Sequence, residues 1–137
     1  MSLMGVVVVG YVPTPRGRAA LEHAVLESRR RDALLVVVNT SRGDALVDED
    51  FLQGEALRTL NTELAESGVA WEVRQPVHGK DVAEELAATV EETDAELLVI
   101  GLRKRSPVGK LLLGSNAQRV LLDAGCPVLA VKAAPES

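Results

Sequence analysis

Five short apolar runs, separated by segments with helical spacing, constrain the fold of this chain more than any other feature of its sequence. Most of the runs are continuous in Val, Leu and Ile instead of alternating with polar residues, which is typical of strands covered on both faces by helices. Each run has the length of one strand. The five predicted strands are Met4 to Val9, Ala33 to Val38, Val69 to Val73, Glu96 to Ile100 and Pro127 to Val131.

Apolar stripes with helical spacing lie between these runs and predict four helices. The stripes comprise Leu21, Ala24, Val25 and Ser28; Leu52, Ala56, Leu57, Leu60 and Leu64; Val82, Leu86 and Val90; and Ala117, Val120, Leu121 and Ala124. Asp81 and Ser115 are the expected N-caps of two helices. Gly68 and Gly125 stand where a left-handed helix stop is expected.

The strict alternation of strand and helix predicts a single domain, residues 1–137, with an α/β fold: a doubly wound, open parallel sheet of five strands in the order 3-2-1-4-5. In this topology the crossover direction reverses between the first and fourth strands. Ligands bind in the crevice beyond the carboxyl ends of those two strands. The candidate site therefore begins at Gly10 and at Gly101.

Composition narrows the class of partner. The chain has 15 Lys and Arg against 20 Asp and Glu, a formal net charge of −5, which disfavours a nucleic-acid partner. Its only thiol, Cys126, predicts a reducing compartment, and we expect the cytoplasm. The apolar runs are too short for a signal-peptide core or a membrane span, so no membrane partner is expected.

One segment of this acidic chain carries a net positive charge. Between Leu97 and Leu122 there is no Asp or Glu, whereas five basic residues fall there: Arg103, Lys104, Arg105, Lys110 and Arg119. This local excess begins where the fourth strand should end, and it indicates an anion-binding site. A solvated basic loop is the alternative.

Glycines punctuate the same segment. Gly101 follows the predicted strand, Gly109 lies in the middle of the loop, and Gly114, Ser115 and Asn116 open the last predicted helix. Glycine lets the backbone approach a phosphate closely, and a helix start presents unpaired N–H groups to it. Ser115 can cap the helix or donate its hydroxyl to a phosphate oxygen, and both interpretations stay open.

The sequence Gly101-Leu102-Arg103-Lys104, followed by nine residues and Gly114-Ser115, resembles the motif G-x2-G-x9-G-[ST] of nucleotide-binding universal stress proteins. A closing Gly125-Cys126-Pro127-Val128 strand is similar too, and the resemblance spans essentially the whole chain. It implies the adenine nucleotide alpha hydrolase-like fold, binding of ATP or AMP, and a homodimer formed through the last strand, Pro127 to Val131.

Two positions depart from that family pattern. Lys104 replaces the second glycine of the motif, and its ammonium offers a direct phosphate contact instead. The Asp that nucleotide-binding members carry at the end of the first strand is absent, since this chain reads Val9-Gly10-Tyr11-Val12-Pro13.

The resemblance also assigns a wall of the adenine pocket. It places Val38 and Asn39 there, while a core position for Val38 is an equal alternative. Gly10 is either a tight exit turn or a position that makes room for a base, and Tyr11 either stacks on a ring or covers the first helix. The sequence-derived nucleotide site thus comprises Gly10, Val38, Gly101, Arg103, Lys104, Gly109, Gly114, Ser115 and Asn116.

The resulting hypothesis is a stress-response binding module for an adenine nucleotide. A dimeric interaction protein without a nucleotide is the alternative, and a slow ATPase is the third interpretation. We expect no catalytic residue, because the site has neither an Asp on the first strand nor an acid near Gly114 to activate water. The acids after the second strand either hold Mg²⁺ on a bound triphosphate or form a solvated helix start: Asp44, Asp48, Glu49 and Asp50.

Overall fold

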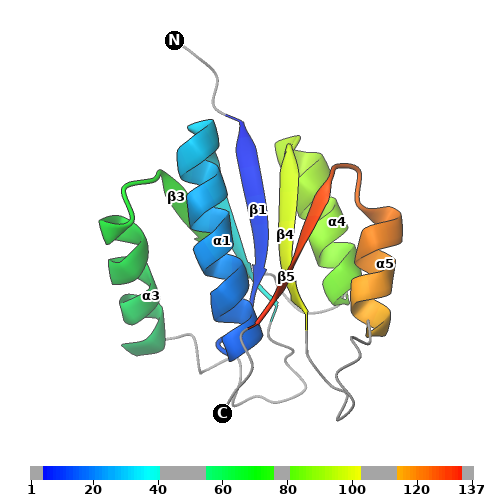
Figure 1. Cartoon of the computed structure of the whole chain (residues 1–137), viewed down its shortest axis with the longest axis horizontal. Coiled ribbons are helices and arrows are strands. Elements are labelled where there is room, and N and C mark those ends of the chain that lie inside the picture. Colours follow the sequence, from blue (N-terminus) through cyan, green and yellow to red (C-terminus); the bar gives the residue numbers. More distant parts are fainter. Residues whose placement is uncertain (1–4, 41–54, 76–80, 103–113, 134–137) are drawn as a thin grey trace.

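The computed structural model describes residues 5–40, 55–75, 81–102 and 114–133. In these residues one parallel sheet has the strand order β3-β2-β1-β4-β5, and four helices lie against it (Figure 1). This confirms the predicted fold class and strand order. The elements are β1 Val6–Tyr11, α1 Pro15–Arg31, β2 Leu34–Asn39, α3 Glu55–Glu66, β3 Trp71–Arg74, α4 Val82–Thr93, β4 Leu97–Leu102, α5 Ser115–Asp123 and β5 Val128–Lys132.

The central strand, β1, has parallel neighbours on both sides. It pairs with β2 from Val6 opposite Leu34, and with β4 from Val7 opposite Leu97. The chain winds outward from β1 to β2 and β3, and then crosses back to β4 and β5. The reversal between β1 and β4 is the topological switch point at which such sheets bind ligands.

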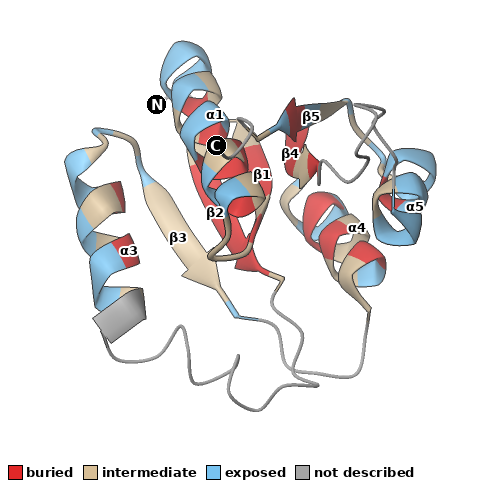
Figure 2. Cartoon of the chain, turned by 60° about the horizontal axis from the view of Figure 1, so that its bottom comes forward, coloured by how far each residue is buried: buried red, intermediate tan, exposed pale blue. Residues whose placement is uncertain are grey.

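The alternation of side chains along the strands gives the sheet two apolar faces. Odd-numbered residues of β1, such as Val7 and Val9, face α1 and α3, whereas Val8 faces α4 and α5. Figure 2 shows the buried residues concentrated in β1, β2, β4 and the facing sides of the helices. Cover on both faces explains why the strands are runs of Val, Leu and Ile rather than alternating sequences.

Local signals start two of the helices. Thr14 is the N-cap of α1, and its side chain accepts a hydrogen bond from the amide of Gly17 at 3.4 Å. Asp81 is the N-cap of α4, as predicted. Its carboxylate accepts from the amide of Glu84 at 2.9 Å, and the Glu84 side chain accepts from the amide of Asp81 at 3.3 Å. This reciprocal capping box satisfies two donors that would otherwise be unpaired.

Helix ends agree with the sequence less well. Gly68 has φ +83°, so its predicted left-handed conformation is confirmed. The stop predicted at Gly125 is wrong, since α5 ends at Asp123, its C-cap Ala124 is extended, and Gly125 is not left-handed. The left-handed stops of α1 and α4 are at Asp32 and Asp94, both with φ 54°. Aspartate tolerates this conformation because its side chain is short and polar.

Two predicted strand ends also need correction. Gly10 is not an exit turn, because β1 continues through it and it pairs with Val38. Gly101 does not follow β4 but lies within it, opposite Val131 of β5. Both glycines keep extended backbone pairing, so the reason for glycine at these positions is space rather than a turn. None of the described helices combines the length and hydropathy needed to cross a membrane.

Candidate functional site

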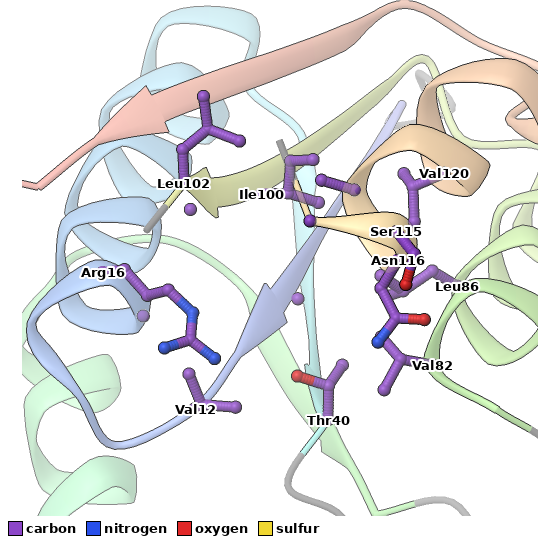
Figure 3. A pocket seen from close by; sticks show the side chains of 15 residues that line it. Val12, Arg16, Thr40, Val82, Leu86, Ile100, Leu102, Ser115, Asn116 and Val120 are labelled. Atoms are coloured by element: carbon purple, nitrogen blue, oxygen red, sulfur yellow. The ribbon is translucent and has the colours of Figure 1, made fainter. Parts of the chain in front are cut away.

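A cavity of about 420 Å³ lies at the carboxyl ends of β1 and β4, at the switch point of the sheet (Figure 3). The strands, α1, α4 and α5 all contribute to it. Its described lining comprises Gly10, Val12, Arg16, Gly17, Thr40, Val82, Leu86, Ile100, Gly101, Leu102, Gly114, Ser115, Asn116, Ala117 and Val120. The structure thus brings Gly10, Gly101, Gly114, Ser115 and Asn116 of the sequence-derived site together around one space.

The interior of this cavity is apolar. Leu86 of α4 and Val120 of α5 are 2% and 3% exposed, and Ile100 of β4 joins them in the same core cluster. At Gly10 an added Cβ would come within 3.2 Å of the Leu86 Cδ1 atom. A side chain at residue 10 would therefore crowd the interior, whereas glycine leaves it open. Apolar walls with a few polar groups are typical of small-molecule sites.

The start of α5 forms one polar edge of the cavity. Gly114 is the N-cap, with φ −66° and ψ 165°, so the prediction that Ser115 is the N-cap is wrong and Ser115 is the first helical residue. Glycine has no side chain to accept an amide hydrogen, and this helix start has no side-chain cap bond in the structure as described. The first-turn amides of a helix have no acceptor within the helix. The first turn of α5, with the positive end of its dipole, therefore lies at the cavity edge that Gly114, Ser115 and Asn116 line.

Arg16, on the opposite side of the cavity, is a residue that the sequence reasoning missed. It is the second residue of α1 and is half-buried. Figure 3 shows its guanidinium directed toward Val12 and Thr40, across the cavity from Ser115 and Asn116. The available signal was its place in the first turn of a helix that has no acidic residue there. A cation at that end opposes the helix dipole.

Close backbone contact fixes the first turn of α1 against the sheet. A Cβ added at Gly101 would lie 2.2 Å from the carbonyl oxygen of Arg16. A Cβ added at Gly17 would lie 1.8 Å from the carbonyl oxygen of Val12. Glycine at residue 101 therefore makes room for the protein's own backbone. This packing role explains why residue 101 is glycine, and the explanation needs no phosphate contact.

An ion pair braces the wall formed by α4 and α5. The Arg119 guanidinium donates to Asp81, the same carboxylate that caps α4. The hydrogen bond to Asp81 raises the pKa of Arg119 above its ordinary value. Of the five cations in the basic segment, Arg119 is therefore used to join two helices and is not part of the described cavity lining.

The remaining predicted residues divide into two groups. Arg103, Lys104 and Gly109 lie outside the described residues, as do the four acids after the second strand and two further cations of the basic segment. Val38 is fully buried in the core on the α4 and α5 side and does not line the described cavity.

Asn39 of the predicted adenine wall and the ring candidate Tyr11 contact other parts of the protein. The Asn39 amide donates to the Gln75 side chain at 3.1 Å. Tyr11 is buried on the α1 side of the sheet, where its hydroxyl accepts from Arg18 at 3.4 Å. Tyr11 therefore covers the first helix, the second of its two predicted alternatives. Burial raises the pKa of the Tyr11 phenol, an effect that Arg18 partly opposes.

The described lining contains no carboxylate, and the described residues contain no group of three His, Cys, Asp or Glu side chains that would hold a metal ion. Cys126 packs against the core, where burial raises the pKa of its thiol.

Comparison with known proteins identifies the family. The universal stress protein family matches residues 4–132. A universal stress protein of Mycolicibacterium smegmatis is 54% identical over 126 residues, which cover 92% of this chain and 96% of that protein. The structure of a universal stress protein from Archaeoglobus fulgidus in complex with dAMP has a TM-score of 0.71 at 25% identity, covering 96% of this chain and all of that one.

A second solved structure of a universal stress protein is similar to this chain. A universal stress protein in complex with cAMP has a TM-score of 0.70 at 25% identity, covering 97% of this chain and all of that one. The two solved structures together with the family match thus extend along nearly the whole of this chain. This chain belongs to the universal stress protein family.

Proposed function

We propose that this protein is a cytoplasmic stress-response module that binds an adenine nucleotide, ATP or AMP, in the cavity between β1, β4, α1 and α5. The observation that carries the proposal is the start of α5, which has no side-chain cap among the described residues and lies at one edge of an apolar cavity at the switch point. Two relatives of similar fold are complexes with the adenine nucleotides dAMP and cAMP. The single thiol, Cys126, is the basis for the cytoplasmic assignment.

In this proposal the apolar interior receives the base and ribose, and the start of α5 receives the phosphate. The described lining offers neither a carboxylate nor a histidine to activate water. We therefore propose binding without rapid hydrolysis, so that occupancy of the site, and not a released product, is the signal. Any Mg²⁺ would enter with a triphosphate.

The test is isothermal titration of nucleotide-stripped protein with AMP and ATP, using two variants at Gly114. Its backbone angles suit Asp and Asn equally, and an added Cβ would meet no described atom within 4 Å. Both residues are good N-caps and should stabilise α5 by a few tenths of a kcal/mol. Only Gly114→Asp places a negative charge beside the phosphate, so we expect roughly tenfold or greater loss of affinity for it and little loss for Gly114→Asn.

Absence of binding to the wild type would reject the proposal, and equal affinities of the two variants would remove the start of α5 from the site. The alternative function is a dimeric interaction protein that holds no nucleotide. Two features of the sequence favour it: Lys104 replaces the second glycine of the motif, and the segment Val9-Gly10-Tyr11-Val12-Pro13 lacks the family's nucleoside-binding Asp. Mass spectrometry of the denatured, freshly purified protein separates the two, since co-purified ATP or AMP is expected only for the nucleotide-binding module.

We further propose a homodimer formed through β5. This strand has β4 as its one partner in the described sheet, and Ala130 faces outward. The preceding helix adds exposed apolar side chains. Leu122 is 83% exposed, and Leu121, which the helical stripe predicted to be buried, is 41% exposed. An unpaired strand edge next to apolar surface is a ready template for pairing with a second copy.

A further inference from the structure

Helix α5 is attached to the protein by fewer buried residues than the other helices that line the cavity. Among its nine residues only Val120 is buried, whereas α1 buries five residues and α4 buries four. Leu121 and Leu122 of α5 are exposed instead. Because burial of apolar side chains is what mainly holds a helix in place, the position of α5 depends more on its polar contacts than the positions of α1 and α4 do.

One of these polar contacts is the ion pair between α5 and the start of α4. The Arg119 guanidinium donates to the Oδ2 atom of Asp81, while the Oδ1 atom of the same carboxylate accepts the amide of Glu84 and caps α4. The capping bond therefore holds the acceptor of Arg119 in one orientation. An exposed ion pair loses side-chain entropy when it forms, and a partner that is already oriented reduces this cost.

The ion pair lies next to the cavity. Val82, which follows Asp81 in the chain, lines the cavity, and so does Ser115, which is one helical turn before Arg119. Helices α4 and α5 therefore begin at the same cavity and contact each other (Figure 1). A shift of α5 along α4 would move the amides of its first turn relative to a bound ligand.

We propose that Asp81 and Arg119 are positioning residues for the phosphate of the bound nucleotide, because their ion pair holds the start of α5 where its amides meet that phosphate. This inference rests on the proposed nucleotide-binding function. Neither residue belongs to the described lining of the cavity, so both act through the backbone of α5. The effect is confined to ligands that carry a phosphate, since the base and ribose lie against the apolar interior.

The test compares the affinities for AMP and adenosine of the stripped wild type, Arg119→Gln, Asp81→Asn and the double variant. AMP is titrated by calorimetry, and adenosine is measured by displacement of bound AMP. Asparagine at residue 81 keeps an oxygen that caps α4 and replaces the acceptor of Arg119 by an NH₂ group.

Either single substitution should weaken AMP binding about 2- to 5-fold, the range expected for one exposed ion pair, and leave adenosine binding unchanged. The double variant should lose no more affinity than either single variant, because both substitutions remove the same contact.

The direction of the Asp81→Asn effect separates positioning from charge neutralisation. If Arg119 served only to neutralise a carboxylate near the phosphate, Asp81→Asn would strengthen AMP binding while Arg119→Gln weakened it. That result overturns the inference while the proposed function stands. So does equal weakening of AMP and adenosine, or an unchanged AMP affinity in either single variant. Failure of the wild type to bind AMP and ATP overturns both.

Arg74→Gln is the matched control. Arg74 forms an exposed ion pair with Glu92 of α4 at 3.0 Å, which also joins two elements of the fold. It lies on β3, at the edge of the sheet opposite β5, and outside the described cavity lining. The substitution should leave both affinities unchanged. A loss of AMP affinity equal to that of Arg119→Gln would show that loss of any such ion pair weakens binding, and it would overturn the inference.

Discussion

Replacing Gly101 by alanine tests whether this residue serves packing or ligand binding. The added Cβ would lie 2.2 Å from the Arg16 carbonyl oxygen and 2.8 Å from its carbonyl carbon. An unstrained carbon to oxygen contact is about 3.3 Å, so the first turn of α1 must move by roughly 1 Å. Both groups belong to backbone that is hydrogen-bonded in β4 or in α1, so neither can rotate away as a side chain could.

The expected change in the free energy of unfolding is the difference between the cost of overpacking and a gain from the unfolded chain. Overpacking of this kind costs about 3 kcal/mol, the upper end of the usual range, because the obstacle is backbone. Loss of glycine's freedom in the unfolded chain returns about 0.5 to 1 kcal/mol. We expect Gly101→Ala to lower the free energy of unfolding by about 2 to 3 kcal/mol, which for a chain of this length is roughly 6 to 10 °C in Tm.

Urea denaturation followed by fluorescence of Trp71, the chain's single tryptophan, measures this free energy. Gly125→Ala is the matched control: its added Cβ meets no described atom within 4 Å and its φ is not left-handed. It should leave stability unchanged or raise it slightly. If Gly101→Ala stays within about 1 kcal/mol of the wild type, the packing argument is refuted, since the predicted clash would then be relieved at little cost.

Three further outcomes are expected. Asp81→Ala removes the capping box and the ion pair to Arg119, so the free energy of unfolding should fall by about 1 to 2 kcal/mol in thermal denaturation. Arg119→Gln removes the ion pair alone, and an equal or larger loss in that variant would contradict the capping role of Asp81. Ala130→Glu should convert the proposed β5 dimer to monomer in sedimentation velocity, whereas Ala130→Ser should not. Burial raises the pKa of Cys126 and of Tyr11 from ordinary values of 9.0 and 10.0, so their contribution to stability is complete below those values and is lost as the pH rises through the raised ones. The Tm should therefore fall above about pH 9, and less steeply in Cys126→Ala and Tyr11→Phe than in the wild type.

The fold was predictable because its strongest signal is local. Continuous apolar runs such as Val6 to Val9 and Leu34 to Val38 have one physical explanation in a chain of this size, a strand covered on both faces. The start of a helix could be predicted where a side chain caps it, as Asp81 caps α4. The prediction was wrong by one residue at α5, where the N-cap is Gly114, which has no side chain.

The site was only partly predictable, because glycine has several uses that sequence does not distinguish. Gly101 was expected to follow its strand, and a strand exit was one of the two alternatives for Gly10, yet both lie inside strands. Their missing side chains make room for the backbone of Arg16 and for Leu86, respectively. The cavity itself depends on how α1 packs on β4, which no local pattern encodes. Arg16 was missed for the same reason, since from sequence alone it is one more basic residue on a helix.

The contact between Gly101 and the backbone of Arg16 has a mechanical consequence. Gly101 is also the residue of β4 that lies opposite Val131 of β5. One backbone position is thus shared between the helix turn that carries the cationic side chain and the outermost strand of the sheet. Because residue 101 has no side chain that could yield, a displacement of that turn acts directly on the backbone of β4, and β5 is the next strand of the sheet.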